Sequence, residues 1–462
     1  MEVVLSGDFY AVNDESYRRI TVRSPSKSHM DKFVNIVNNI QRSLSIKVDP
    51  IDKYDYVNVR TSKEVIEEFE WYNMPTFEPQ QSSNTTPIVY LFLKKNSNKA
   101  KQFLDKLDKS GVEITDLPYT WYPSKPKTLN ETEGYIWENT KIQPKYPIYI
   151  ISKGRWEKRY TSRYLEWCNI PYKIVVEESE YEEYAKVIDK SKILVLTLSY
   201  LKSQNDKGDG GGIPARNFVL DHSRKSGAKR HWILDDNIQG YTRLLNGERR
   251  LTRSGAVFRS IEDYCDRFEN VILAGHNYHM FGFSPNLAPY IPNTRVYSSI
   301  LIDNSIKHRW RGKYNEDTDL SLRVLKDGYP TLLFNHFLAV KLTTLTQKGG
   351  NTDSVYSVKN ALFLKADSLV KQHPDVAQIK KRFGRIHHLV DYSPFKDNEL
   401  KYKPNIKNRL TANANNYGLK LIRFADTKSI WRDKKDGSGL DHNECKLMDL
   451  DTLRREEEEH IK

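Results

Sequence analysis

Short apolar segments alternate with amphipathic ones along the middle of the chain, and this alternation predicts strands and helices in turn. Apolar runs predict strands at residues 147–151, 172–176, 193–198, 231–234, 270–274, 297–302 and 331–334. Helical spacing of apolar residues predicts helices at residues 156–169, 181–189, 215–226 and 318–326. Strands that alternate with helices favour an α/β fold with a mostly parallel, helix-covered sheet.

The pattern differs on either side of this region, which predicts four segments. They are a small N-terminal α+β module at residues 1–122, a linker at 123–144, the α/β domain at 145–352 and a mainly helical C-terminal extension at 353–462. The module carries a buried-strand pattern at residues 88–93 and a helical pattern at residues 97–110. The linker begins with a stretch rich in Pro, Lys and Asn.

Composition narrows the classes of protein that fit. A chain of 462 residues is too long for one ordinary core, and its net charge of +13 attracts polyanions such as nucleic acid. The 3 cysteines have no C-x-x-C spacing, so we expect neither a disulfide framework nor a structural zinc site. The first residues lack a secretory signal pattern, and no run approaches the roughly 20 apolar residues of a membrane span. We therefore expect a cytoplasmic protein without a membrane partner.

Two acidic clusters are candidates for chemistry. Asp235 and Asp236 follow the strand predicted at 231–234, and ligands bind at the carboxyl ends of strands in open α/β sheets. Such a pair can hold Mg²⁺ or Mn²⁺ shared with substrate phosphates, although an acidic turn without function has the same composition. Glu316 and Asp317 lie at the start of a later helix, where acids are also ordinary helix-start residues. If both clusters face one side of the sheet, one can hold a metal while the other accepts a proton.

A glycine-rich segment, residues 208–212, opens the helix that carries Arg216. Glycine permits close backbone approach, and a helix amino terminus beside an arginine favours an anion. A flexible loop before a helix would have a similar composition. The segment matches neither the P-loop nor the dinucleotide-binding pattern, so neither of these sites is indicated.

Together these residues suit metal-dependent transfer of a sugar from a nucleotide sugar. A cation would neutralise the departing diphosphate, while a separate carboxylate takes the proton of the attacking hydroxyl. In this interpretation Asp236, with Asp235 behind it, holds the metal, and Asp317 is the base. His336, just after the strand predicted at 331–334, is a candidate to complete the metal shell, although a lone histidine is more often structural.

The order of these segments resembles that of GT-A glycosyltransferases, and among them the TET-associated glycosyltransferases of bacteriophages. The segments are Tyr149–Arg155, the glycine-rich segment with Arg216, Trp232–Asn237 and Asn315–Leu320. The resemblance extends over roughly residues 145–352. It implies a GT-A fold with a nucleotide-sugar-binding sheet, a UDP-linked donor such as UDP-glucose, and Mn²⁺ or Mg²⁺. The acceptor it implies is the hydroxyl of a 5-hydroxymethylpyrimidine in DNA, such as 5-hydroxymethylcytosine.

The resemblance also implies roles for individual residues. Asp235-Asp236-Asn237 stands where GT-A enzymes have their metal-binding D-x-D, with Asn237 in place of the second acid. Glu316-Asp317 stands where many of them have the carboxylate that activates the acceptor. The donor contacts it implies are Lys153, Arg155, Arg216 and Asp235.

Two alternatives remain open from the sequence. One is the same enzyme class with a glycan, protein or lipid-linked acceptor; the other is a nucleic-acid-binding or metal-dependent nucleic-acid-cleaving protein. Sugar transfer requires a nucleotide sugar, whereas a nuclease degrades DNA with Mg²⁺ alone. Candidate contacts to DNA phosphates are Arg249, Arg250, Arg253 and the basic run 380–385.

Overall fold

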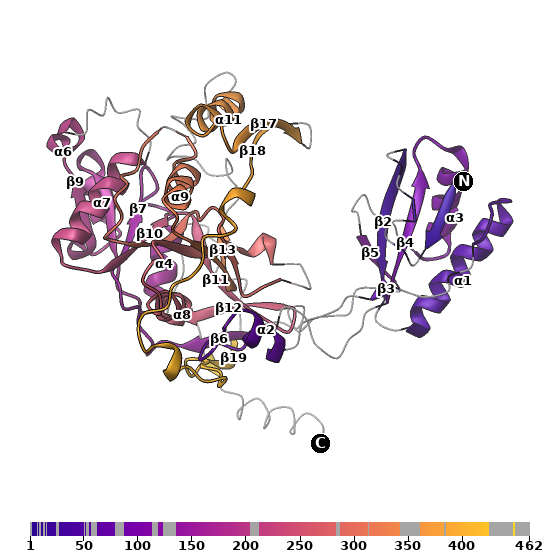
Figure 1. Ribbon diagram of the computed structural model, residues 1–462, viewed down its shortest axis with the longest axis horizontal. Coiled ribbons are helices and arrows are strands. Elements are labelled where there is room, and N and C mark those ends of the chain that lie inside the picture. Colours follow the sequence, from indigo (N-terminus) through magenta and orange to yellow (C-terminus); the bar gives the residue numbers. More distant parts are fainter. Residues whose placement is uncertain are drawn as a thin grey trace. The chain divides into compact units, whose positions relative to one another are not determined.

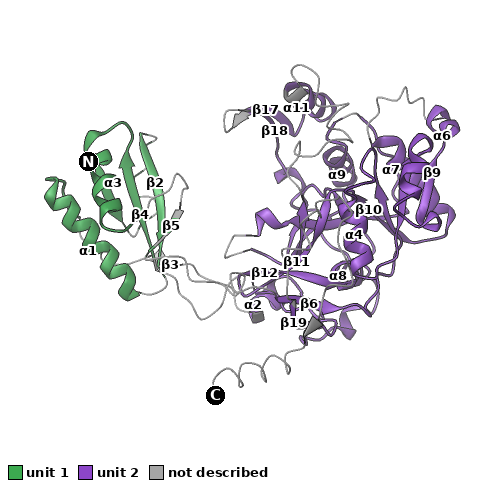
Figure 2. Ribbon diagram, turned by 180° about the vertical axis from the view of Figure 1, so that it is seen from behind, with its two compact units in different colours: residues 1–61, 80–132 green, residues 62–79, 133–462 purple. Residues whose placement is uncertain are grey.

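The structure is a computed structural model, and its described residues fall into two compact units (Figure 2). It describes residues 2–6, 8, 11–12, 14, 16–24, 27–49, 51, 55–56, 62–78, 87–112, 119–122, 135–203, 212–282, 287–312, 314–341, 361–382, 385–424 and 447–448. Unit 1 comprises residues 1–61 and 80–132, and unit 2 comprises residues 62–79 and 133–462. Residues 62–79 thus lie in the larger unit, because Trp71, Met74 and Phe77 are buried in its core.

Unit 1 is a small sheet with two helices. Its elements are β1 (Val3–Ser6), β2 (Tyr17–Arg23), α1 (Lys27–Ser43), β3 (Asp55–Tyr56), β4 (Pro87–Lys94), α3 (Asn98–Lys109) and β5 (Tyr119–Trp121). The strand order is β1-β4-β2-β5, with β3 paired to β4, and α1 and α3 lie together on one face (Figure 1). Alternate residues of β4, Val89, Leu91 and Leu93, pack against both helices. The strand and helix predicted at 88–93 and 97–110 are confirmed as β4 and α3.

Unit 2 contains the remaining elements. Its strands are β6 (Tyr135–Asn139), β7 (Ile148–Ile151), β8 (Lys173–Glu177), β9 (Ile193–Leu196), β10 (Arg230–Asp235), β11 (Ile238–Leu245), β12 (Glu248–Ser254), β13 (Leu273–Tyr278), β14 (Tyr290–Pro292), β15 (Ser299–Asp303), β16 (Thr331–Lys341), β17 (Ala377–Arg382), β18 (Arg385–Val390), β19 (Lys420–Phe424) and β20 (Leu447–Met448). Its α-helices are α2 (Ser62–Glu68), α4 (Tyr160–Trp167), α5 (Tyr181–Ala185), α6 (Leu198–Ser203), α7 (Ile213–Lys225), α8 (Ala256–Cys265), α9 (Glu316–Lys326) and α11 (Ala361–Gln372). Short 3₁₀ turns η1–η5 lie at Glu178–Glu180, Lys190–Lys192, His279–Phe281, Ser393–Phe395 and Lys407–Arg409.

The large sheet of unit 2 is mixed. Its order is β20-β19-β6-β12-β11-β16-β13-β15-β10-β7-β8-β9, with β14 added beside β16. The neighbours β10, β7, β8 and β9 pair in parallel, as the alternation of strands and helices predicts. Beyond β10, antiparallel β15 enters and most further pairs are antiparallel. The predicted parallel arrangement therefore holds for the four neighbouring strands β10, β7, β8 and β9, which helices connect in turn along the chain, and the rest of the sheet is mixed.

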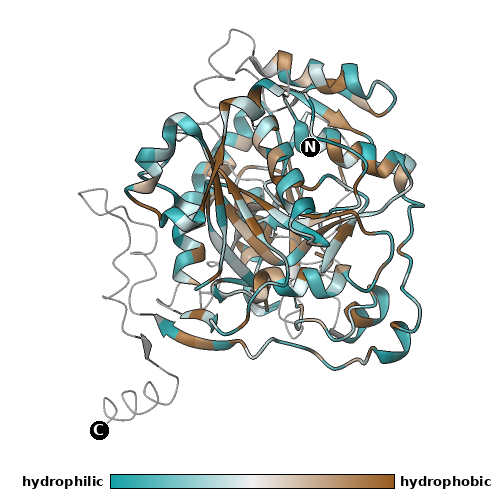
Figure 3. Ribbon diagram, turned by 90° about the vertical axis from the view of Figure 1, so that its left-hand side faces the viewer, coloured by the Kyte–Doolittle hydropathy of each residue, from teal (hydrophilic) through white to brown (hydrophobic). Residues whose placement is uncertain are grey.

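Residue alternation along the central strands buries both faces of this sheet. Trp232 and Leu234 of β10 pack on the face covered by α4 and α8, whereas Ile233 packs on the face covered by α7 and α9. Apolar residues concentrate along these central strands, while helices carry the polar surface (Figure 3). Because both faces of the sheet are buried, the face to which a strand residue points decides which helices its side chain contacts.

The C-terminal region differs from the mainly helical extension that the sequence predicts. Within its described residues, α11 is the single α-helix, and it is followed by the antiparallel hairpin β17–β18 and by β19, which joins the large sheet beside β6. The described residues of the basic run 380–385 lie in these two strands, where Arg382 pairs with Arg385, and not in a helix. The acidic run 456–459 lies outside the described residues.

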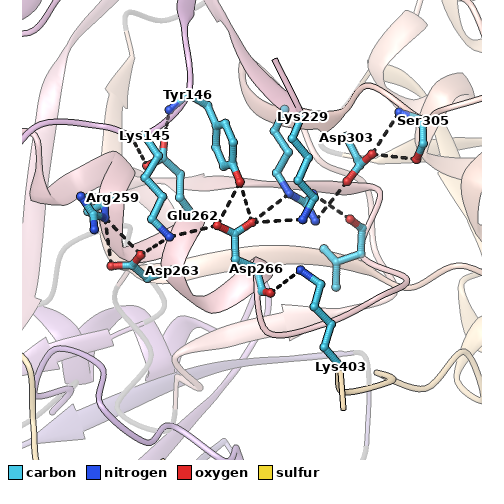
Figure 4. Close-up of polar contacts among 12 residues, drawn as sticks. Lys145, Tyr146, Lys229, Arg259, Glu262, Asp263, Asp266, Asp303, Ser305 and Lys403 are labelled. Carbon is cyan, nitrogen blue, oxygen red and sulfur yellow. Dashed lines mark hydrogen bonds and ion pairs between the residues drawn. The ribbon is translucent and has the colours of Figure 1, made fainter. Parts of the chain in front are cut away.

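A polar network fixes α8 to the amino end of β10 (Figure 4). Asp266 accepts hydrogen bonds from the Lys145 Nζ at 3.0 Å and the Tyr146 hydroxyl at 2.8 Å, and it pairs with Arg230 at 3.4 Å. Buried Glu262 accepts from the Lys145 backbone N–H at 2.7 Å. The network holds the start of β10, five residues before its carboxylate end, and so fixes the strand that presents the candidate site.

Among the described residues, no helix combines the length and apolarity needed to cross a membrane.

Candidate active site

The end of β10 directs its two carboxylates to opposite faces of the sheet. Asp235 shares the alternation of Ile233 and faces α7 and α9, whereas Asp236 faces the loop after β7. The Asp235 backbone N–H donates to the Ser298 carbonyl at 2.9 Å, which fixes the strand end beside β15. The two adjacent aspartates therefore have different partners.

Arg216 joins the two acidic clusters. Helical spacing places it on the same face of α7 as the core residues Val219 and Leu220, and it is 3% exposed. Its Nη2 lies 3.1 Å from Asp235, 3.5 Å from Glu316 and 3.6 Å from Asp317. Clusters about eighty residues apart in sequence thus meet around one buried guanidinium, which also stacks on the Trp310 ring at 4.7 Å.

Asp317 occupies the first turn of α9 on its buried face. It precedes Leu320 and Val324 by three and seven residues, and both pack in the core between α7, α9 and the sheet. Its Oδ2 accepts from the Ser298 N–H at 3.4 Å, while its buried Oδ1 has no hydrogen-bond partner among the described residues. Burial raises the pKa of Asp317 to about 7, against the opposing effect of Arg216 and with support from neighbouring Glu316 and Asp235. A carboxyl with this pKa and an oxygen that accepts no hydrogen bond among the described residues is suited to accept a proton near neutral pH.

Lys341 is a site residue that the sequence analysis missed. It ends β16, whose apolar run predicted a strand only to residue 334, and its side chain is 16% exposed. The Nζ donates to Asp235 Oδ2 at 2.7 Å and to the Ser298 hydroxyl at 2.7 Å, and lies 3.4 Å from the Tyr278 hydroxyl. Although burial opposes it, Lys341 and Arg216 together hold the pKa of Asp235 well below its usual range.

Ser298 is a second missed residue, and it connects the three charged groups. Its carbonyl accepts from Asp235, its N–H donates to Asp317 and its hydroxyl accepts from Lys341. Its φ of 60° lies in the left-handed region, which is uncommon for a non-glycine residue. Strained backbone of this kind persists where surrounding contacts fix it, as they do at this position.

Asp236 organises the loop after β7. Its Oδ1 accepts from the Arg155 guanidinium and its Oδ2 accepts from the Ser152 hydroxyl at 2.8 Å. Lys153, in the same loop, is half-exposed and pairs with Glu177 at 2.6 Å. Lys153 and Arg155 thus lie near the carboxyl end of β7, where the sequence predicts the donor contacts.

His336 lies on the other face of the sheet from Asp235. It shares the alternation of Leu332 and Phe334, which pack on the side of α4 and α8. Its Nε2 hydrogen-bonds to the Ser260 hydroxyl at 2.8 Å, and its ring contacts Trp71 at 5.0 Å. The strand alternation therefore makes His336 a core residue and removes it from the predicted metal shell.

The carboxylates do not fit the divalent cation that the sequence predicts. Both oxygens of Asp235 accept from cationic side chains, and both oxygens of Asp236 accept from Arg155 and Ser152. A Mg²⁺ or Mn²⁺ site needs several oxygen lone pairs directed at one point. No group of three or more His, Cys, Asp or Glu side chains in the described part of the chain is arranged to hold a metal ion.

An anion fits the amino terminus of α7. Gly212 is the N-cap and has no side chain to cap the helix, so the N–H groups of the first turn, other than the missing one of Pro214, have no partner within the helix. A Cβ atom at Gly212 would lie 3.7 Å from the Arg216 Nε. The Nε and Nη1 of Arg216 are buried without a hydrogen-bond partner among the described residues. Residues 208–211, which complete the glycine-rich segment, lie outside the described residues.

The arginines predicted to contact DNA have structural partners instead. Arg250 is 4% exposed and pairs with Glu248 at 2.7 Å, and Arg253 pairs with Glu138 at 3.0 Å. Arg249 donates to the His279 carbonyl at 2.8 Å. Lys380 is exposed on β17, and the side chains of 381–385 lie outside the described residues.

Comparison with known families identifies the segment that contains this site. Residues 146–350 match the model of the family described as TET-associated glycosyltransferase. The match begins just before β7 and includes Asp235, Arg216, Asp317 and Lys341. No curated protein matches the chain.

Proposed function

We propose that this glycosyltransferase transfers a sugar from a UDP-linked donor to a 5-hydroxymethylpyrimidine in DNA. Its enzyme class follows from residues 146–350, which are a TET-associated glycosyltransferase domain. The observation that carries this proposal is the meeting of Asp235, Glu316 and Asp317 around Arg216 at the carboxyl end of β10. Open α/β sheets bind ligands at this end of their strands.

The donor diphosphate is proposed to bind at the amino terminus of α7. The first-turn N–H groups and the helix dipole favour an anion there, and the Arg216 N–H groups that have no hydrogen-bond partner among the described residues are additional donors. Lys153 and Arg155, in the loop after β7, are proposed contacts to the nucleotide, and Asp235 orients Arg216 from the opposite side. This arrangement places positive charge where a departing diphosphate gains negative charge.

Asp317 is proposed as the general base. The acceptor oxygen forms a bond to the anomeric carbon of the sugar, and the proton of the acceptor hydroxyl passes to Asp317 Oδ1. At the same time the bond between the anomeric carbon and the diphosphate oxygen breaks, and its electron pair leaves with the nucleotide. The raised pKa of Asp317, about 7, matches proton acceptance near neutral pH. Glu316, 3.5 Å from Arg216, adds negative charge that favours the protonated product of this step.

An exposed apolar turn beside the site supports a flat acceptor. Met280 and Phe281 in η3 are 63% and 46% exposed, and the Phe281 ring stacks with Tyr278 at 6.1 Å between centroids. The Tyr278 hydroxyl hydrogen-bonds to Ser298 at 2.6 Å and therefore connects this turn to Lys341 and Asp235. Pyrimidines stack on aromatic side chains, and a base turned out of the duplex could reach this surface.

Two assays test the proposal. The first measures the melting temperature with UDP, GDP, ADP and dTDP, because a ligand that binds only the folded state raises it. The second measures transfer from UDP-sugars to DNA that contains 5-hydroxymethylcytosine, with unmodified DNA and glycans as alternative acceptors. We expect a UDP-selective shift and transfer to the modified DNA. Degradation of DNA with Mg²⁺ alone, without need of a nucleotide sugar, would contradict the proposal.

A further inference from the structure

Two cationic side chains occupy both sides of the carboxylate that ends β10. Lys341 Nζ lies 2.7 Å from Asp235 Oδ2, and Arg216 Nη2 lies 3.1 Å from Asp235 Oδ1. A divalent cation bound to Asp235 would therefore lie beside two positive charges, which repel it. The residues that approach Asp235 come from β16 and α7, on either side of the end of β10.

From this arrangement we propose that Arg216 and Lys341 take the place of the divalent cation, so that sugar transfer does not require a metal. This inference rests on the proposed function and concerns the same site. The two side chains together carry two positive charges, as Mg²⁺ or Mn²⁺ does, and the carboxylates that hold them offset part of this charge, as carboxylate ligands offset that of a metal ion. Arginine and lysine can stabilise transferring phosphate groups as bound metal ions do.

Both cations retain hydrogen-bonding capacity for a phosphate. The contact between Lys341 Nζ and the Tyr278 hydroxyl, at 3.4 Å, exceeds the usual range of a hydrogen bond, so this N–H can turn to a stronger acceptor. The Arg216 Nε and Nη1 are buried and have no hydrogen-bond partner among the described residues. Buried polar groups normally have partners, and phosphate oxygens would complete this set.

The neighbouring carboxylates keep the two cations in place. Glu316 and Asp317 lie 3.5 and 3.6 Å from Arg216, and Ser298 accepts a second hydrogen bond from Lys341 at 2.7 Å. Asp235 thus acts as a positioning residue that holds the cations. In the metal-dependent alternative, the same carboxylate would instead bind the ion directly.

The first experiment compares the full-length protein in chelator and in Mn²⁺. We expect the UDP-induced rise in melting temperature and the transfer rate to be equal in both conditions, and purified protein to contain no stoichiometric metal. Binding and transfer that disappear in chelator and return with Mn²⁺ would overturn this inference and leave the proposed function intact. Absence of transfer in both conditions would overturn the proposed function itself.

The second experiment removes one charge. In Lys341→Met, transfer in chelator should fall at least ~10²-fold, comparable to loss of one preorganised donor to a developing charge. Mn²⁺ should then restore part of this rate, because the substitution frees Asp235 Oδ2 as a ligand. Lys326→Met is the matched control, because Lys326 pairs with Asp375 at 2.8 Å outside the site. Its transfer rate should change neither in chelator nor in Mn²⁺. If Lys341→Met transferred sugar in chelator as fast as the wild type, the inference would be overturned. If this variant does not fold, the comparison of the wild-type protein in chelator and in Mn²⁺ still tests the inference.

Discussion

Replacing Asp317 with Asn tests the general base directly. The substitution keeps an oxygen that can accept from the Ser298 N–H but removes the group that takes up the proton. General base catalysis contributes about 10²–10⁴-fold to rates, so we expect a loss of that size in transfer, equivalent to about 3–5 kcal/mol of activation free energy. UDP binding should remain, because Asp235 and Glu316 still hold Arg216.

The same variant should be more stable than the wild type at alkaline pH. Burial raises the pKa of Asp317 from its ordinary 3.8 to about 7, so the folded protein binds this proton more tightly than the unfolded chain. The stability that the protonated group contributes is fully present below pH 3.8 and is lost as the pH rises through about 7. The two pKa values differ by roughly three units, and each unit corresponds to about 1.4 kcal/mol. Ionisation of this carboxyl group at high pH therefore lowers the free energy of unfolding by at most about 4 kcal/mol.

The assay combines kinetics with thermal melting. Wild-type transfer at saturating donor should rise as the pH passes through about 7, because the base must be deprotonated. Asp317→Asn should be slow at every pH and should melt above the wild type at pH 8. Asp327→Asn, at the other end of α9 and paired with His308, is the control and should keep the wild-type rate. A variant that retains most of its rate, or that loses rate and stability together, would refute the assignment of Asp317 as a base.

Three further substitutions separate structural residues from the site. Asp319→Asn should lower the free energy of unfolding by about 3–5 kcal/mol in denaturant titrations, because it breaks a buried pair with Arg323 at 2.6 Å. Gly275→Ala should cost about 3 kcal/mol in the same titration, since its Cβ would lie 2.2 Å from the Ser299 carbonyl oxygen. His336→Leu should cost about 1–3 kcal/mol through the lost hydrogen bond, yet keep the transfer rate, and a large loss of rate in a folded variant would return His336 to the site.

The strands nearest the site were predictable because they carry continuous apolar runs. Those predicted at 147–151, 172–176 and 231–234 are β7, β8 and β10. The hairpin β11–β12 was missed although its turn, Asn246-Gly247, has positive φ at both residues and is the pairing that two-residue hairpins favour. That dipeptide could have revealed the hairpin, and with it the antiparallel half of the sheet.

The site residues were predictable only in part. Sequence motifs selected Asp235 and Asp317, but the motif alone does not say which helix face an acid occupies. Asp317 shares a face with Leu320 toward the sheet, whereas Asp319 accepts a hydrogen bond from the Nε2 of His373, just after α11, at 2.9 Å. Lys341 was missed because the predicted strand ended at residue 334, before the polar pair Asn335-His336, although the apolar residues 337–340 continue the strand to Lys341.

The net charge of +13 overstates the positive surface that DNA can meet. Several arginines are buried: Arg216 neutralises the carboxylates of the site, and Arg243 lies over the Trp137 ring at 4.5 Å. Arg267 is 7% exposed and stacks on Tyr264. The salt dependence of DNA binding counts only cations that meet phosphates, so its slope should be far smaller than the net charge suggests. Under the proposed function, we therefore expect recognition of the acceptor to depend more on the exposed turn at 279–281 and on chemistry at Asp317 than on general attraction to the duplex.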